Sequence, residues 1–424
     1  MSETTDLSRA PEAMIADMGR RARSAAGRVA ALPPGAKPKA LVAAARALRD
    51  AAPEILAANE EDMAQARTAG LSAALLDRLM LDEERVANMA AGVDAIAALP
   101  DPAGTLIEET ERPNGLKLSR VRVPIGVIGI IYESRPNVTA DAAALCVMAG
   151  NAVILRGGSE AARSNRAIHA AFVRGLEEAG VPTDLVQLVQ TTDRAAVGAM
   201  LTADGAIDLI VPRGGKSLVA RVQNEAKVPI LAHLDGINHV YVHASADPKM
   251  AAAIVVNAKL RRTGVCGAME TLLIDCDYPA SAELLRALTD GGCEVRGDAA
   301  ARAIDPAIAT ADAADWDTEY LEAIASVAIV DGVDAAIAHI AAHGSHHTDA
   351  IVAEDEAVAN RFLATVDSAI VLWNASTQFA DGGEFGLGGE IGIATGRLHA
   401  RGPVALEGLT TYKWVGRGTG QVRP

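Results

Sequence analysis

Short strands and helices alternate along the middle of the sequence, and this order constrains the fold more than any other feature. Between residues 120 and 230, apolar runs such as VIGIIY and NAVIL are followed by segments with helical spacing, among them SNRAIHAAFVRGLEEAG. Continuous Val, Ile and Leu runs are typical of strands covered on both faces, and strands that alternate with helices form parallel sheets. We therefore expect an α/β protein with a doubly wound parallel sheet.

The same alternation starts again at about residue 231, where HVYVHA, DPKMAAAIVVNAKL, ETLLID and AELLRALT follow one another. Asp247 and Pro248 form a good helix start, because Asp caps free N–H groups and Pro suits the first helical position. We therefore expect a second α/β domain. Residues 8–100 are rich in Ala with apolar spacing of three and four, which indicates amphipathic helices.

Composition excludes several classes of function. The 424 residues carry a formal net charge of −15, which argues against nonspecific binding to nucleic acid or to anionic membranes. The longest apolar run, VPIGVIGII, is too short to cross a bilayer, and the N-terminus lacks a secretory pattern. Four cysteines in this length do not make a disulfide framework. We expect a cytoplasmic protein with reduced thiols.

Two junctions combine a strand, a glycine turn and a helix: LRGGSEAARSN (155–165) and VPRGGKSLVAR (211–221). Backbone N–H groups and the helix dipole at such a turn can face a phosphate, and both turns carry basic residues. The alternative is a plain change of chain direction. A Walker A loop is excluded because Ile210 stands where its first glycine is required, and GxGxxG is absent.

Cys266 stands in RRTGVCGAMETLL, with Gly264 and Gly267 close on either side, between a predicted helix and a predicted strand. Reactive thiols need access, and glycines let a substrate approach the backbone closely. The alternative is a small buried hydrophobe, the role that we assign to the other cysteines, which are Cys146, Cys276 and Cys293. Arg261 and Arg262 would lower the thiol pKa if their side chains turn toward it.

Asn137 in ESRPNVTAD directly precedes a predicted helix. It is either an ordinary N-cap or an amide donor aimed at an oxyanion. Histidines also gather in HIAAHGSHHTD, at positions 339, 343, 346 and 347. This stretch lacks a carboxylate or cysteine partner and is typical of a helix end and loop, so we expect no metal site there.

Several segments together resemble the γ-glutamyl phosphate reductase family of the aldehyde dehydrogenase superfamily, over nearly the whole chain. They are YESRPNVT, LRGGSEA, RRTGVCGAMETLL, VDSAIVLWNAST and FGLGGEIGIATGRLHARGPVALEGLTTYKW. The resemblance implies an aldehyde dehydrogenase-like fold with a Rossmann-like cofactor domain, a catalytic domain and a small β element for oligomerisation. The implied ranges are 1–107 and 123–230 for NADP binding, 231–370 for catalysis, 108–122 and 400–424 for oligomerisation, and 371–399 for a glycine-rich segment lining the site.

The resemblance also implies an activity: NADPH-dependent reduction of L-glutamate 5-phosphate to L-glutamate 5-semialdehyde and phosphate through a cysteine thioester, the second step of proline biosynthesis. It implies a homodimer or homotetramer. No kinase domain precedes the reductase segments, so glutamate 5-kinase is expected to be a separate protein, with which transient contact is conceivable. An acyltransferase that uses Cys266 without a nicotinamide, and a binding protein without catalysis, are the rival interpretations.

Carried over by motif, the resemblance implies that Cys266 is the nucleophile and that Asn137 contacts the oxyanion. It implies that Arg156 holds the cofactor ribose, that Arg213 and its turn hold the pyrophosphate, and that Glu319 contacts the nicotinamide ribose. The full implied cofactor set is Arg156, Gly157, Gly158, Ser159, Arg213, Gly214, Gly215, Lys216 and Glu319. Hydrolytic members carry a glutamate in an ELGG-like segment. The matching segment here, AHLDGIN, has His233 in place of that glutamate, so we expect the base for water to be missing. The alternatives are that His233 merely fills space beside a turn, or that Asp235 serves as the base.

Overall fold

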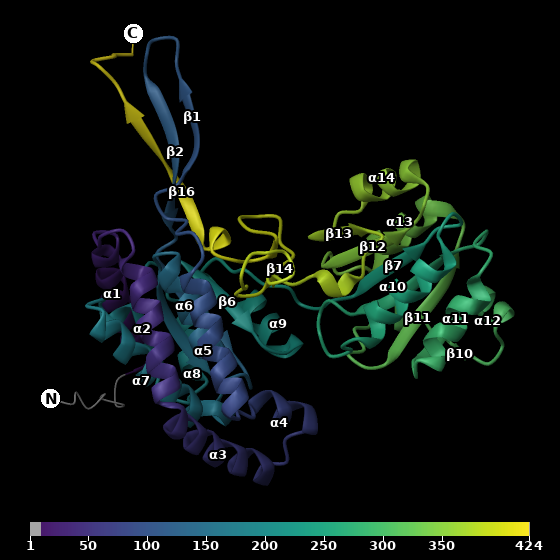
Figure 1. Ribbon diagram of the computed structural model, residues 1–424, viewed down its shortest axis with the longest axis horizontal. Helices are drawn as coiled ribbons and strands as arrows, with labels where there is room; N and C mark the ends of the chain where they lie inside the picture. The colour runs from purple at the N-terminus through teal and green to yellow at the C-terminus, as the bar shows by residue number, and fades with distance from the viewer. Residues whose placement is uncertain (1–9, 424) are drawn as a thin grey trace. The chain divides into compact units, whose positions relative to one another are not determined.

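The computed structural model describes residues 10–423, which form two compact units (Figure 1). Unit 1 runs to Ala232 and includes Leu387–Gly392 and the chain from Val404 onward. Unit 2 comprises His233–Gly386 and Ile393–Pro403. The glycine-rich segment 371–399 is therefore divided between the two units.

Unit 1 begins with helices that share an Ala-rich, amphipathic pattern. They are α1 (Pro11–Val29), α2 (Ala36–Asp50), α3 (Ala52–Thr68), α4 (Ala73–Leu79) and α5 (Glu83–Ala97). Small side chains let helices pack closely in this unit: a Cβ atom on Gly175 of α7 (Ala162–Glu178) would lie 2.4 Å from the backbone of Ala44 in α2. Among the described residues, no helix combines the length and apolar character needed to cross a bilayer.

The core of unit 1 is a parallel sheet with the strand order β5-β4-β3-β6. Its strands are β3 (Val127–Tyr132), β4 (Ala152–Gly157), β5 (Val186–Leu188) and β6 (Leu209–Arg213). The accompanying helices are α6 (Val138–Met148), η1 (Ser159–Ala161), α7 (Ala162–Glu178), η2 (Thr183–Leu185), α8 (Ala195–Leu201) and α9 (Lys216–Glu225). The predicted alternation of buried strands and helices is confirmed, and it places the two glycine turns at the carboxyl ends of β4 and β6, the two strands that flank β3.

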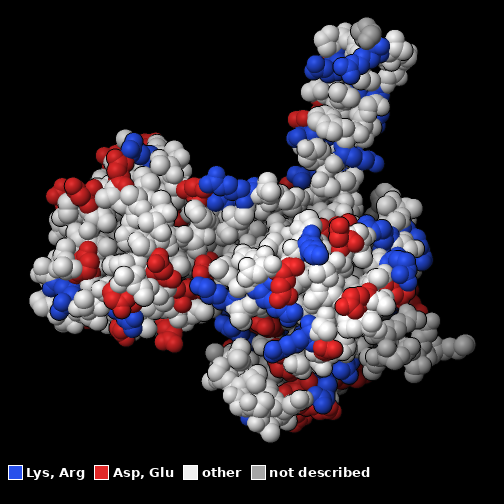
Figure 2. Space-filling view, turned by 180° about the vertical axis from the view of Figure 1, so that it is seen from behind, with Lys and Arg blue, Asp and Glu red and all other residues white. Residues whose placement is uncertain are grey.

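A separate antiparallel sheet projects from the rest of unit 1 (Figure 1). It consists of β1 (Leu106–Glu111), β2 (Lys117–Pro124) and β16 (Thr410–Arg417), with the short helix η5 (Glu407–Leu409) before β16. The Arg120 guanidinium lies 4.7 Å from the ring centre of Tyr412, so a cation–π contact ties the two strands together. Figure 2 shows basic side chains gathered near the tip of this sheet, where β2 begins and β16 ends.

Unit 2 is built on a seven-stranded parallel sheet with the order β10-β9-β11-β8-β7-β12-β13. The strands are β7 (Asn238–Val242), β8 (Met269–Asp275), β9 (Glu294–Gly297), β10 (Ala309–Thr310), β11 (Ile324–Val330), β12 (Thr348–Val352) and β13 (Ile370–Trp373). The helices are α10 (Pro248–Leu260), α11 (Ser281–Asp290), α12 (Ala299–Ile304), η3 (Asp315–Asp317), α13 (Gly332–His343), α14 (Glu356–Thr365) and η4 (Thr377–Phe379). A two-stranded sheet, β14 (Ile393–Ala394) with β15 (Gly402–Pro403), completes the unit.

Local signals in unit 2 behave as predicted. Asp247 caps α10, because its side chain accepts a hydrogen bond from the backbone N–H of Met250 at 2.8 Å, and Pro248 is the first helical residue. Apolar side chains pack on both faces of the sheet and form two clusters, one including Val255 and Leu285 and the other Ile340 and Phe362. Burial on both faces explains why the strands are continuous apolar runs.

The burial of the cysteines other than Cys266 differs from the prediction at one position. Cys146 and Cys293 are buried, as expected of small hydrophobic residues, but Cys276 is exposed, so the prediction of a buried role for it is wrong. Cys276 directly follows β8, where the chain leaves the sheet, and its thiol lies 3.8 Å from a carboxylate oxygen of Asp331.

Candidate active site

Cys266 lies in the turn between α10 and β8, and Asn238 holds this turn in place. The Asn238 amide nitrogen donates to the carbonyl oxygens of Cys266 at 2.6 Å and of Ala268 at 2.8 Å. The amide oxygen of Asn238 accepts from the Thr348 N–H at 3.1 Å. A buried side chain from β7 thus fixes the cysteine backbone against β12, and the Cys266 side chain remains half-buried, as a nucleophile requires.

Gly236 lies directly against the backbone of Cys266. A Cβ atom at Gly236 would lie 2.1 Å from the Cys266 carbonyl oxygen and 3.0 Å from its Cα, so only glycine fits without a shift. The Glu319 carboxylate accepts a hydrogen bond from the Gly236 N–H at 3.0 Å. Glu319 therefore holds the backbone of Gly236, which lies against Cys266 in unit 2. The resemblance does not imply this contact.

Replacing Gly236 with alanine is expected to lower kcat by about 10²-fold, because the added methyl group displaces the reacting sulfur by a distance on the order of 1 Å. The matched control is Gly27→Ala in α1, where a Cβ atom meets nothing within 4 Å and alanine favours the helix. Steady-state kinetics with thermal unfolding of both variants checks this prediction. A kcat for Gly236→Ala equal to that of the control would show that the contact does not position the thiol.

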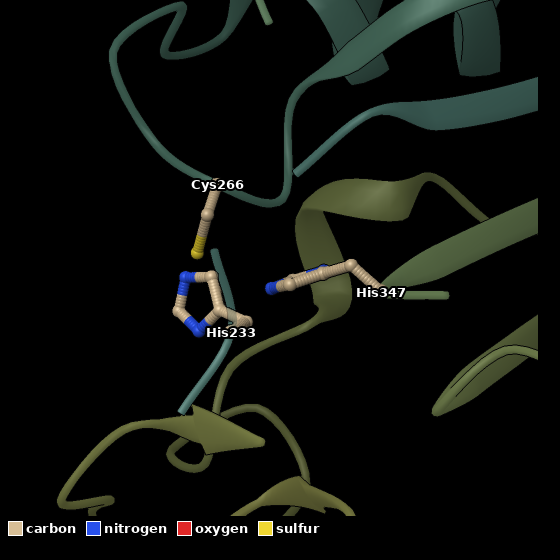
Figure 3. Close-up of side chains that lie close together, drawn as sticks. All are labelled: His233, Cys266 and His347. Carbon is tan, nitrogen blue, oxygen red and sulfur yellow. The ribbon is translucent and has the colours of Figure 1, made fainter. Parts of the chain in front are cut away.

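His233 approaches the thiol of Cys266 (Figure 3). One ligand atom from each of His233, Cys266 and His347 lies within 4.8 Å of the other two, and all three residues belong to unit 2. The His233 Nδ1 lies 2.7 Å from the carbonyl oxygen of Ile393, so Nδ1 carries the proton and donates it. This tautomer leaves the lone pair on Nε2, the atom able to accept a proton from a thiol.

His347 lies beside this pair and is fully buried. Its ring centre is 4.9 Å from that of His233, at an angle of 75° between the ring planes. Nδ1 of His347 is 2.9 Å from the Thr348 hydroxyl, whereas Nε2 is buried without a hydrogen-bond partner among residues 10–423. Burial, assisted by the neighbouring His233, lowers the pKa of His347 to about 3, so its imidazole is neutral near pH 7.

The sequence interpretation of the histidine cluster was incomplete. It treated the stretch as lacking a carboxylate or cysteine partner, but the fold supplies both from distant segments: Cys266 lies near His347, and an Asp317 carboxylate oxygen lies 2.8 Å from His343 Nδ1. The prediction of a helix end followed by a loop is confirmed, since α13 ends at His343 and β12 begins at Thr348.

Asn137 occupies the position before α6 in unit 1, but its side chain makes no capping hydrogen bond. Its amide nitrogen donates instead to the Asp141 carboxylate at 2.8 Å, which orients the amide. Burial raises the pKa of Asp141 to about 6, against the opposing effects of this hydrogen bond and of the Arg213 charge. The interpretation of Asn137 as an ordinary capping side chain is therefore wrong.

The turn after β4 packs tightly. Arg156 is buried, and its guanidinium donates to the carbonyl oxygens of Gly157 at 2.8 Å and of Thr192 at 3.0 Å. A Cβ atom at Gly157 would lie 2.1 Å from the Asn165 amide, and one at Gly158 would lie 2.1 Å from the Glu160 carboxylate. Ser159 then begins η1. A side chain at either glycine would have to displace Asn165 or Glu160, and Arg156 links this turn to Thr192 in the segment after β5.

The turn after β6 already holds an anionic group. Arg213 ends β6, Lys216 begins α9, and the Gly215 N–H between them donates to the Glu133 carboxylate at 3.1 Å. A Cβ atom at Gly214 would lie 2.4 Å from the same carboxylate. A negative charge at a helix N-terminus is stabilised by the helix dipole, so this turn is chemically suited to a phosphate of a nicotinamide cofactor. Sequence reasoning did not identify Glu133.

Comparison with known proteins agrees with this architecture. Residues 2–290 match the model of the "Aldehyde dehydrogenase family". The chain is 68% identical over 420 residues to a gamma-glutamyl phosphate reductase of Rhizorhabdus wittichii, covering 99% of this chain and 98% of that protein. It is 69% identical over 411 residues to the gamma-glutamyl phosphate reductase of Novosphingobium aromaticivorans, covering 97% of each.

A solved structure is similar as well. The crystal structure of gamma-glutamyl phosphate reductase from Thermotoga maritima superposes with a TM-score of 0.94 at 40% identity, over 97% of this chain and 100% of that chain. The expected aldehyde dehydrogenase-like fold is confirmed. The chain belongs to the aldehyde dehydrogenase family, and the relatives that it matches over nearly its whole length are gamma-glutamyl phosphate reductases.

Proposed function

We propose that the protein reduces L-glutamate 5-phosphate to L-glutamate 5-semialdehyde and phosphate, using NADPH, as the second step of proline biosynthesis. The observation that carries this proposal is the thiol of Cys266 next to the imidazole of His233 on a fixed turn. The names of the relatives, at 68% and 69% identity, give the acyl phosphate as the substrate class.

The proposed chemistry begins at the sulfur of Cys266. His233 Nε2 accepts the thiol proton, and the thiolate attacks the acyl carbon, with the oxyanion stabilised by the Asn137 amide and the Cys266 backbone N–H. Phosphate leaves when the oxyanion collapses, and the acyl group remains on Cys266 as a thioester. NADPH, when bound, supplies the hydride that reduces this acyl group to the level of the aldehyde. Release of the semialdehyde restores the thiol.

The direct test is a coupled assay in which glutamate 5-kinase and ATP generate L-glutamate 5-phosphate for the purified protein. The proposal requires oxidation of NADPH that depends on glutamate, on ATP and on the kinase. Acyl transfer from the phosphate without any nicotinamide would favour the acyltransferase instead, and the absence of both reactions would indicate a binding protein.

We propose the two glycine turns of unit 1 as the NADPH site. Arg213, Gly214, Gly215 and Lys216 would hold the pyrophosphate, and Arg156 with Gly157, Gly158 and Ser159 would shape the ribose end. The Gly215 N–H donates a hydrogen bond to the Glu133 carboxylate, which supports an anion site at the turn after β6. A cofactor phosphate would take over this N–H from Glu133. Glu319 contacts Gly236 in unit 2, and a further contact with the nicotinamide ribose is part of the same proposal.

Replacing Arg213 with alanine is expected to raise the KM for NADPH by roughly tenfold while kcat changes little, because a phosphate contact contributes uniform binding. Arg156→Ala should also lower the melting temperature, since it removes the donor to the carbonyl oxygens of Gly157 and Thr192. Initial rates measured at varied concentrations of NADPH and of acyl phosphate test the prediction for Arg213→Ala. A selective rise in the KM for the acyl phosphate would assign Arg213 to the other substrate.

We also propose that the sheet of β1, β2 and β16 joins copies of the chain into a homodimer or homotetramer. All residues of β1 are exposed, and Tyr412 and Trp414 of β16 are exposed by 48% and 54%. A projecting sheet with open edges and exposed aromatic rings is suited to pairing with another chain.

A further inference from the structure

The cluster of His233, Cys266 and His347 has a donor set suited to a metal ion. Its two imidazoles and one thiol offer ligand atoms within 4.8 Å of one another (Figure 3). Ligand atoms on a tetrahedral Zn²⁺ lie about 3.3–3.6 Å apart, given Zn–N and Zn–S bonds of about 2.0–2.3 Å. A contraction of about 1 Å, within reach of side-chain rotation, would bring the three atoms to that spacing.

His347 supplies an independent observation that points to a ligand. A fully buried imidazole normally satisfies both ring nitrogens, yet Nε2 of His347 has no hydrogen-bond partner in the part of the chain that the structure describes. Figure 3 shows this ring directed toward His233 and Cys266. The proposed thioester chemistry uses Cys266 and His233 and leaves Nε2 of His347 without a role.

Groups outside the cluster already orient both rings as metal ligands. Nδ1 of His233 donates to the Ile393 carbonyl oxygen at 2.7 Å, and Nδ1 of His347 lies 2.9 Å from the Thr348 hydroxyl. Metal-binding histidines almost always donate their second N–H to a carbonyl or another oxygen in this way, which fixes the tautomer. In His233 Nε2 is then the atom with the lone pair, and Nε2 of His347 carries the lone pair in the tautomer whose Nδ1 donates to the Thr348 hydroxyl.

We propose that His233 Nε2, Cys266 Sγ and His347 Nε2 form a reversible binding site for Zn²⁺, with a fourth coordination position left for water. The Cys266 thiol loses its proton on binding, and the sulfur lone pair that would attack the acyl carbon becomes bonded to the metal. Zn²⁺ is therefore an inhibitor that competes with the acyl phosphate. Metal binding itself stands on geometry alone, whereas the inhibition rests on the proposed function of Cys266.

The test uses chelator-treated full-length protein and Zn²⁺ alone as the probe. Calorimetry should find one Zn²⁺ per chain at this site, and Zn²⁺ should slow alkylation of Cys266 by iodoacetamide at least tenfold, as followed by peptide mass spectrometry. Asp275, Cys276 and Asp277 form a second group of possible ligand atoms, so the alkylation rate of exposed Cys276 is the internal control for Zn²⁺ binding outside the proposed site. Unchanged alkylation of Cys266 at saturating Zn²⁺ would overturn the proposal without any variant.

Variants locate the ligands. His347→Gln and Cys266→Ser should each weaken Zn²⁺ binding by about tenfold or more, and Cys276→Ser should leave it unchanged. Equal affinity in wild type and His347→Gln would overturn the site, as would loss of binding only in Cys276→Ser. Zn²⁺ that protects Cys266 while leaving the reductase reaction uninhibited would support the metal site and refute the catalytic role of Cys266.

Discussion

Replacing Cys266 with alanine is expected to abolish turnover of the acyl phosphate, with a loss on the order of 10⁴-fold or more in kcat, because in the proposed mechanism no other group forms the thioester. The fold should persist, since the Asn238 amide donates its hydrogen bond to the backbone carbonyl oxygen of residue 266 and not to the side chain. NADPH affinity, measured by fluorescence titration, should also persist.

Cys276→Ala is the matched control for this experiment, because it removes an exposed thiol that follows β8 in the same unit. It should retain most of the activity. Turnover by Cys266→Ala at a rate close to that of this control would contradict the covalent mechanism, because an active variant must also be folded.

Replacing Asn137 with alanine should lower kcat by about 10²- to 10³-fold, the usual cost of removing one donor to a developing oxyanion. The α6 helix should be unaffected, since the Asn137 side chain does not cap it. The measurement is kcat together with the melting temperature. An unchanged kcat would assign the oxyanion contact to another group.

Asp141→Asn separates a direct contact from support of the amide. This variant removes the carboxylate that accepts the Asn137 amide hydrogen bond at 2.8 Å but keeps Asn137 itself. Asp141→Asn should lower kcat far less than Asn137→Ala does. An equal loss in both variants would mean that the Asn137 amide functions only while the Asp141 carboxylate holds it.

Sequence reasoning predicted the elements well because their signals are local. Alternation of apolar runs and helices specified parallel sheets, and Asp247 with Pro248 marked the start of α10 to the residue. Burial at strand ends was less predictable. Cys276 follows a buried strand by one residue, and its exposure depends on the direction in which the chain leaves the sheet.

The surroundings of Cys266 could be predicted only in part, because they come from distant segments. Gly236 precedes β7, Asn238 is its first residue and His347 precedes β12, so the order β8-β7-β12 brings them to Cys266. A polar Asn at the start of a fully buried strand was the one available signal, since a buried amide needs partners. Nothing local to His347 indicated a cysteine partner.

The most direct test of the central claim, a thioester on Cys266 that exchanges with phosphate, is the reverse reaction of the unmodified enzyme. His233, which the resemblance aligns with the glutamate of hydrolytic members, is held by the Ile393 carbonyl next to the thiol. Phosphate is already a competent nucleophile, whereas water needs a general base that is worth ~10²–10⁴-fold, and His233, once it holds the proton of the thiol, has no lone pair left to act as that base. The account predicts that L-glutamate 5-semialdehyde and NADP⁺ yield NADPH only when phosphate or arsenate is present. Rapid NADPH formation without either anion, with free glutamate as product, would contradict it.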